Sequence, residues 1–312
     1  MLRFVGRRLA ESIPVLVLAS VVVFSMLHLV PGDPVDAMMG AAALQSTARQ
    51  AVVDRVRDEL GLNEPLPVQY ARWALGALHG DLGRSFIRDR PVSELIAERL
   101  PSTVELAGLS MLIAASLGLV CGLVAALKRN TPIDGVIMAV SLGGVSMPSF
   151  WFAVLLILVF SVGLRLLPAT GSGTFAQLIL PAVALGYEGM ALVARVTRAA
   201  ILEVLTRPYV TTARAKGLPP RAVLLRHVLR NALIPVVTVM GLQVGRLLAG
   251  SVIIETVFAR QGIGQLAIEA ILQKDYPLVQ GIILLSASTY VVANLLVDLA
   301  YGYLDPRLRA AA

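Results

Sequence analysis

The side chains that most often carry enzymatic chemistry are few and scattered along this chain of 312 residues. It has three histidines, His28, His79 and His227, and a single cysteine, Cys121. The histidines are far apart in sequence and fall on different predicted sides of a membrane, so we predict no shared metal site. Cys121 lies in an apolar stretch, which is typical of a packing residue and excludes an internal disulfide. We predict no catalytic residue in this chain.

The sequence also lacks the strings that bind a nucleotide or activate a nucleophile. It contains no G-x-x-x-x-G-K-[ST] phosphate loop, no H-E-x-x-H and no G-x-S-x-G. We therefore expect no cofactor and no metal in this chain. The absence of motifs from soluble enzymes does not exclude an intramembrane hydrolase, so an enzyme and a passive channel remain distant alternatives to a transport subunit.

One short basic segment has the design of a rigid element that a partner could bind. Arg207 and Pro208 precede a polar run that ends at Gly217, and two further prolines follow at 219 and 220. Proline suits the first turn of a helix, and glycine followed by proline stops one. We predict a short helix of about two turns between these start and stop residues. An ordinary basic loop is the alternative, but it would not explain the start and stop residues.

The composition places these elements in a membrane. Hydrophobic residues make up 57% of the chain and charged residues only 15%, whereas soluble domains carry about 25% charged residues. The apolar residues gather in runs close to the ~20 residues that cross a bilayer. We predict an all-α membrane protein with six transmembrane helices, at about Leu9–Val30, Thr103–Leu127, Gly135–Leu164, Gln177–Ala199, Ala232–Val257 and Leu278–Tyr303. The first run is too long for a signal peptide and has no cleavage site, so we expect it to be retained.

The distribution of Lys and Arg predicts the orientation. Most of these residues lie in one alternating set of short loops, which should be cytoplasmic together with both termini. The net charge of +7 thus reflects these loops, and we expect no nucleic-acid binding because no basic stretch is interleaved with aromatic residues. The predicted organisation is an N-terminus and first span (1–30), an extracytoplasmic loop (31–101) and a five-helix core (102–312).

The extracytoplasmic loop has signals for short helices. Thr47 and Gln50 fit a capping box before one helical run, and a second helix is predicted over Val68–Leu78, stopped by Gly80. The alternative is a helix lying flat on the membrane surface.

Two charges inside the predicted spans could act on a solute. Glu188 lies in the fourth span and Arg246 in the fifth, at depths that differ by only ~7 Å when counted at 1.5 Å per residue. Such charges normally face protein or water, because exposure to lipid is costly. We predict that they pair and face a polar cavity, with a snorkelling Arg246 at a subunit interface as the alternative.

Over nearly its whole length the sequence resembles the inner-membrane permeases of binding-protein-dependent ABC importers, in the dipeptide, oligopeptide, nickel and glutathione branch. The resemblance rests on the order and spacing of several strings. These are PGDP (31–34), GDLGRS (80–85), RPVSELIAERLPSTVEL (90–106), YVTTARAKGL (209–218), RHVLRNALIPVVT (226–238), KDYPLVQ (274–280) and DPR (305–307).

The resemblance implies the fold of type I ABC importer permeases and a role for the basic segment at 208–218. In the family this segment is a coupling helix that docks on the ATP-hydrolysing subunit. The residues that would contact it are Tyr209, Thr212, Ala213, Arg214, Ala215, Lys216, Gly217 and Leu218. Where the broader family pattern is Glu-Ala-Ala-x-x-x-Gly, this chain has Thr211, Thr212 and Ala213 before the glycine, so we expect no contact that relies on that glutamate. Gln261 also stands where proline is common.

The resemblance further implies the partners and the location. They are a second related permease, two ATPase subunits that bind ATP and Mg²⁺, an extracytoplasmic substrate-binding protein, a peptide substrate and the lipid of a bacterial inner membrane. Glutathione, a nickel chelate or another small solute is the alternative substrate for the same fold.

Overall fold

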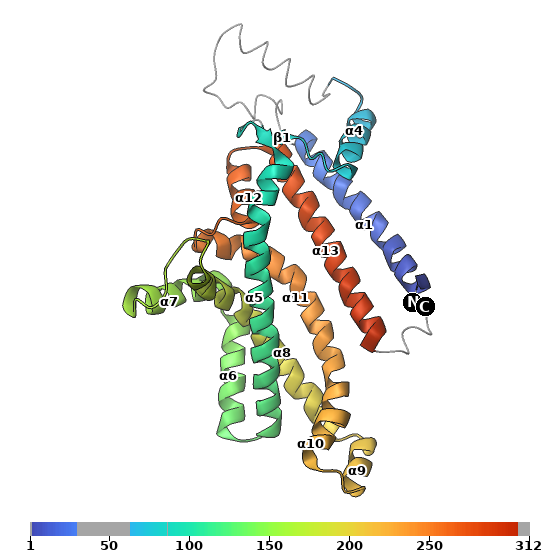
Figure 1. Cartoon of the computed structure of the whole chain (residues 1–312), viewed down its shortest axis with the longest axis vertical. Helices are drawn as coiled ribbons and strands as arrows, with labels where there is room; N and C mark the ends of the chain where they lie inside the picture. Colours follow the sequence, from blue (N-terminus) through green and yellow to red (C-terminus); the bar gives the residue numbers. More distant parts are fainter. Residues whose placement is uncertain (1, 30–62, 86, 305–312) are drawn as a thin grey trace. The chain divides into compact units, whose positions relative to one another are not determined.

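The computed structural model describes residues 2–29, 63–85 and 87–304, and nearly all of its regular structure is helical (Figure 1). The predicted helix that begins near Thr47 lies outside the described residues. In chain order the elements are α1 (Leu2–Leu29), α4 (Leu66–Leu78), β1 (Arg84–Ser85), β2 (Arg90–Pro91), α5 (Val92–Leu127), α6 (Pro132–Ser146), α7 (Ser149–Leu156), the π-helical η1 (Ile157–Gly163), α8 (Phe175–Leu205), α9 (Pro208–Ala215), α10 (Pro220–Ala222), the π-helical η2 (Val223–Leu229), α11 (Arg230–Val257), α12 (Ile263–Leu272) and α13 (Tyr276–Leu304).

Four stretches among the described residues are single helices long and apolar enough to cross a membrane. They are Val92–Leu127, Phe175–Leu205, Pro220–Val257 and Tyr276–Val297, and α6 with α7–η1 makes a fifth if the bent pair is one span. The apolar part of α1, Ala10–Ser25, falls short of the same length test. The sixth span, at α1, therefore stays a prediction.

The third predicted span is not one straight helix. α6 and the helix formed by α7 and η1 meet at a bend of 113°. Met147 lies at the break in an extended conformation, with φ −91° and ψ 127°, which the residue before a proline favours over helical geometry. Pro148 then starts the new helix. The bend was not predicted, because the apolar run from Gly135 to Leu164 is uninterrupted.

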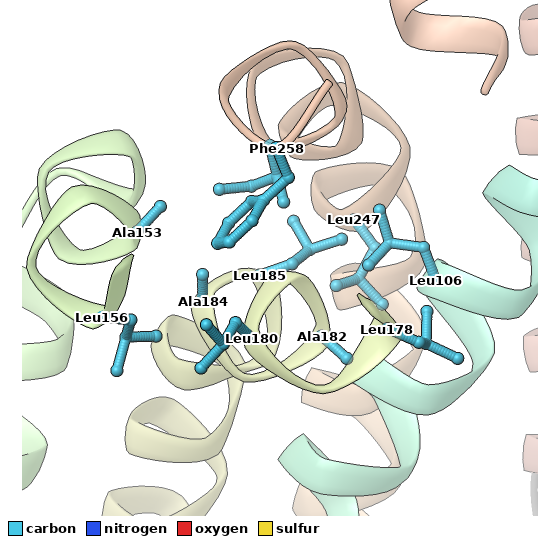
Figure 2. Close-up of a cluster of buried hydrophobic side chains, with 11 residues drawn as sticks. Leu106, Ala153, Leu156, Leu178, Leu180, Ala182, Ala184, Leu185, Leu247 and Phe258 are labelled. Atoms are coloured by element: carbon cyan, nitrogen blue, oxygen red, sulfur yellow. The ribbon is translucent and has the colours of Figure 1, made fainter. Parts of the chain in front are cut away.

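The chain divides into two compact units, and the first comprises residues 1–8, 102–261 and 292–312. Its core surrounds α8, which contributes most of the buried leucines and alanines in Figure 2. Leu106 from α5, Ala153 and Leu156 from α7, and Leu247 from α11 pack around them. α5 approaches α8 closely at Gly122, where an added Cβ would lie 2.5 Å from the Ala194 carbonyl oxygen. Small residues let membrane helices pack at this distance.

The second unit comprises residues 9–101 and 262–291. α4 lies almost where the sequence predicted it and packs on α1, with the Tyr70 ring 5.5 Å from that of Phe24. Gly80 ends this segment in the left-handed region, with φ +84°. β1 and β2 form a small antiparallel ladder, in which Ser85 pairs with Arg90.

Two of the family strings meet inside this second unit. The Ser85 hydroxyl from GDLGRS donates to the carboxylate of Asp275 from KDYPLVQ at 2.5 Å, and both residues are buried. Asp275 precedes α13 and also accepts a hydrogen bond from the backbone N–H of Leu278, which makes it the N-cap of that helix. Burial raises the pKa of the Asp275 carboxyl, against the opposing effects of these hydrogen bonds and of the nearby Arg88.

Candidate functional site

The predicted basic helix is present as α9, and its ends are made by the residues that the sequence singled out. Arg207 is extended before the helix, and Pro208 occupies the first helical position. At the other end Gly217 adopts φ +76°. Its N–H donates to the Arg214 carbonyl at 2.9 Å, and the N–H of Leu218 donates to the Ala213 carbonyl at 3.4 Å. These two bonds are the Schellman arrangement, which requires a left-handed residue at position 217.

α9 has one buried side and one exposed side. Val210 and Ala213 are buried and belong to an apolar cluster that includes Ile201 of α8, Val228 of η2 and Ala232 of α11. These two residues lie three positions apart and therefore share one helical face. α9 is thus fixed through its apolar face to the C-terminal end of α8 and to η2, which continues into α11.

The residues that face away from this cluster are those that a docking partner could touch. They are exposed, polar or basic for the most part, and comprise Tyr209, Thr211, Thr212, Arg214, Ala215, Lys216, Gly217 and Leu218. Ala213 was predicted to be among the contact residues, but it is only 5% exposed and packs within this chain instead. Val210 was not singled out, although an apolar pair three apart in a polar helix could have indicated its role.

α8 carries a tightly held ion pair toward its C-terminal end. Both guanidinium nitrogens Nε and Nη2 of Arg198 donate to the Asp134 carboxylate of α6, each at 2.7 Å. The Asp134 side chain is 7% exposed, and it also accepts from the backbone N–H of Asn130 at 3.1 Å. This two-bonded geometry is the strong form of an arginine–carboxylate contact. It fixes the start of α6 against α8.

The predicted pair of charges inside the spans does lie together. Arg246 Nη1 of α11 is 3.3 Å from Glu188 Oε1 of α8. The two side chains are 58% and 48% exposed in this chain. The structure thus brings together the two residues that depth counting selected, and what they do for a passing solute remains a prediction.

A third group of charges escaped the sequence analysis. The Arg260 side chain is 1% exposed and donates to Glu105 at 2.9 Å and to the Ser102 carbonyl. Nearby, the Thr103 hydroxyl donates to the buried Glu255 at 2.6 Å. These contacts join α5 to the end of α11. The residues around Arg260 show no periodic pattern that would indicate whether this arginine is buried or exposed.

The described residues contain no group of three or more His, Cys, Asp or Glu side chains that could hold a metal ion. What the arrangement offers is instead an exposed basic helix anchored to two long spans, and a half-exposed charge pair between the same two spans. Neither arrangement contains a nucleophile beside a base.

Comparison with known proteins identifies the family. Residues 118–310 match the family described as binding-protein-dependent transport system inner membrane component. Residues 1–107 match the family described as the N-terminal part of such membrane components.

Two relatives match along almost their whole length. The chain is 42% identical to the di/tripeptide transport system permease protein DppB of Pseudomonas aeruginosa over 337 aligned positions, which cover 99% of each chain. It is 40% identical to the dipeptide transport system permease protein DppB of Escherichia coli K12, again with 99% of each chain covered.

The fold is also that of a solved transporter subunit. The chain aligns with a chain of the inward-facing MetNI methionine ABC transporter at a TM-score of 0.59 and 19% identity, covering 68% of this chain and 96% of that one. At this identity the likeness establishes the fold, which is that of type I ABC importer permeases.

Proposed function

Because this chain belongs to the family of inner-membrane components of binding-protein-dependent transport systems, we propose that it forms, with a second related permease, the pathway of an ATP-driven importer for di- and oligopeptides. The observation that carries the peptide assignment is the identity of 40–42% to dipeptide and di/tripeptide permeases over 99% of their lengths. The chain is a transport subunit of the inner membrane and not itself an enzyme. Two partner subunits bind ATP and Mg²⁺, and an extracytoplasmic binding protein delivers the substrate.

The packing of α9 supports a mechanical role in this complex. Its exposed basic face is available to an ATPase subunit, while Val210 and Ala213 fix it to α8 and α11. Closure of the ATPase pair on ATP would displace α9, and these buried contacts would carry the displacement to the two spans. Alternating access then needs only a rocking of helices around a pathway between the two permeases.

A substitution at Gly217 tests this role. Its φ of +76° is strained for a β-branched residue, yet nothing lies within 4 Å of an added Cβ, so only the turn is affected. We expect Gly217→Val to abolish most peptide uptake by the reconstituted complex, either with loss of substrate-stimulated ATPase activity or with ATPase activity that no longer drives uptake. Gly217→Asn is the matched control, because asparagine tolerates this conformation. Normal uptake by Gly217→Val at normal complex levels would overturn the role of α9.

The orientation of the chain can be tested separately. We expect single cysteines at Ser46 and Ser172 to react with an impermeant thiol reagent in intact cells that lack Cys121, and a cysteine at Thr211 to be protected. Labelling at Thr211 would reverse the proposed cytoplasmic location of α9 and of both termini.

The substrate class is tested with the cognate binding protein. We expect peptides to stimulate ATP hydrolysis by the complete complex. If glutathione or a nickel chelate stimulated ATP hydrolysis and peptides did not, the chain would still be a permease subunit, but the proposed substrate class would be wrong.

A further inference from the structure

In the middle of α8 and of α11, one exposed charge lies on an otherwise buried or uncharged surface. Between residues 177 and 198 of α8, all of which are described, Glu188 is the only exposed position. The one exposed position in this part of α8 is therefore a carboxylate. Glu188 therefore does not belong to an ordinary exposed polar face of a helix.

α11 has a corresponding open seam. Its exposed positions in the outer half follow spacings of four and three residues, which is the spacing of a helix that faces another helix. These positions are Leu242, Arg246, Ala249, Ile253 and Thr256. Arg246 is the only charged residue among them. This exposed row is thus a surface on which another helix could pack, and Arg246 is its one cation.

Both charges lie deep within their helices. Arg246 is 16 residues from the start of α11 and 11 from its end, and Glu188 is 13 residues from the start of α8 and 17 from its end. At 1.5 Å per residue, each lies at least about 16 Å from either end of its helix. A charge facing lipid there costs about 3 kcal/mol. The exposed sides of these residues must therefore face water or a partner protein.

A buried amide extends this polar surface inward. Gln243 lies one turn before Arg246 and is 4% exposed. Its Nε2 is 2.9 Å from where a Cβ on Gly189 would lie, so a side chain at position 189 would displace the amide. The crossing of α8 and α11 is therefore close, and it holds the two charges at the edge of a fixed contact.

The ion pair itself is loosely made. It has one contact of 3.3 Å, whereas a strong charge-assisted hydrogen bond of this type measures about 2.7–2.9 Å. Arginine has five N–H donors in a fork that matches a carboxylate, and this pair uses one of them. Most of the hydrogen-bonding capacity of both groups remains for a ligand.

We propose that Glu188 and Arg246 form a binding point for the two charged ends of a short peptide in the pathway, which deepens the proposed function and rests on it. The guanidinium of Arg246 receives the terminal carboxylate, and the carboxylate of Glu188 receives the terminal ammonium. The ends of a dipeptide are separated by more than one Cα–Cα step of about 3.8 Å, so the two side chains part as the peptide enters. The pair closes again when the peptide leaves, which keeps both charges compensated in the empty pathway.

Neutralising both residues separates this role from simple packing. An ion pair that serves only structure can be replaced by two neutral side chains with little loss, whereas removing one partner leaves an unpaired charge. A packing role thus predicts that the double variant Glu188→Gln/Arg246→Met recovers what the single variants lose. The proposal predicts that dipeptide uptake by the double variant stays low, because neither end of the peptide is bound.

The experiment uses the complete complex in proteoliposomes, with its binding protein and radiolabelled dialanine. At equal levels of assembled complex we expect kcat/KM for uptake to fall about tenfold or more in the double variant, as the loss of charge-assisted hydrogen bonds implies, with basal ATPase activity retained. Arg246→Lys keeps the charge but not the forked guanidinium, so its kcat/KM should lie between those of the wild type and the double variant. Glu64→Gln/Arg72→Met, which neutralises a pair in the second unit, is the control and should leave uptake unchanged.

Two results would overturn this inference. One is uptake by the double variant at the wild-type rate, and the other is an equal loss in the control. Either result leaves the proposed function intact, because the wild-type complex still imports the peptide. Failure of the wild-type complex to import any peptide would instead remove the proposed function itself.

Discussion

Two of the ion pairs on α8 differ in almost every physical respect, although their α8 residues, Glu188 and Arg198, lie ten positions apart in the chain. Arg198 holds Asp134 with two bonds of 2.7 Å, and Asp134 is nearly buried. Arg246 touches Glu188 once, at 3.3 Å, and both side chains are about half exposed. The first pair fixes α6 to α8 through both oxygens of the Asp134 carboxylate, whereas the second leaves most of its donors and acceptors unused.

On our proposal, one helix serves both structure and transport through these two pairs. A buried, fully bonded pair is expensive to break and so stabilises one arrangement of helices. An open, singly bonded pair contributes little to stability, and it can exchange partners at small cost. The predictions below test the two halves of this comparison.

The largest effect is expected from Asp134→Ala. It leaves the guanidinium of Arg198 uncompensated in a site that is 25% exposed, and we expect a loss of about 3 kcal/mol, the low end for a broken buried pair. The measurement is the thermal midpoint of the purified complex by size-exclusion chromatography. Glu203→Ala, which breaks the exposed Glu203–Arg207 pair, is the control and should change the midpoint little. Equal shifts in the two variants would contradict the distinction.

A smaller loss is expected at the close contact between α5 and α8. A Cβ on Gly122 would lie 2.5 Å from the Ala194 carbonyl oxygen, and overpacking of this kind costs about 1–3 kcal/mol. Gly122→Ala should therefore lower the thermal midpoint.

Gly108, on the same helix, has nothing within 4 Å of an added Cβ. Gly108→Ala is therefore the matched control and should be neutral or slightly stabilising, since alanine favours helix. A tolerated Gly122→Ala would mean that the two helices can move apart without cost.

Arg246→Met should have a still smaller effect on stability. Pairs as exposed as this one contribute about 0–1 kcal/mol, so the thermal midpoint should stay close to that of the wild type while peptide uptake falls. A shift as large as that of Asp134→Ala would show that this pair is structural, and the contrast between the two pairs would fail.

The smallest effect is expected from Asp275→Asn, in the second unit, and it should be visible as a pH dependence. Burial raises the pKa of the Asp275 carboxyl in the folded state, so the native protein binds the proton more tightly than the unfolded chain. Stability from this group is therefore greatest at low pH. It decreases as pH rises from the unfolded pKa near 4 through the raised folded pKa.

Asparagine removes that slope but can still cap α13 and accept from Ser85. The thermal midpoints of the two proteins should therefore diverge as pH is raised across this window, in favour of Asp275→Asn. A wild-type midpoint that rises relative to the variant over the same window would show that hydrogen bonds to the carboxylate outweigh its burial.

Much of the site could be predicted because its signals are local. Pro208 and Gly217 mark the ends of α9 by their own backbone geometry, and the structure places the helix between them. Glu188 and Arg246 could be matched because helices have a fixed rise per residue, so depth follows from counting. The apolar runs likewise gave four of the spans, since a bilayer imposes a length on them.

The rest depended on how helices pack. Asp134 and Arg198 are 64 residues apart, and Arg260 and Glu105 are 155 apart, so no local pattern could join them. The burial of Ala213 and Val210 follows from the ends of α8, η2 and α11 that cover one side of α9. The bend of 113° at Met147 and Pro148 lies within a continuous apolar run. Proline permits such a bend, but whether a membrane helix continues or turns there is decided by the surfaces against which its two halves pack.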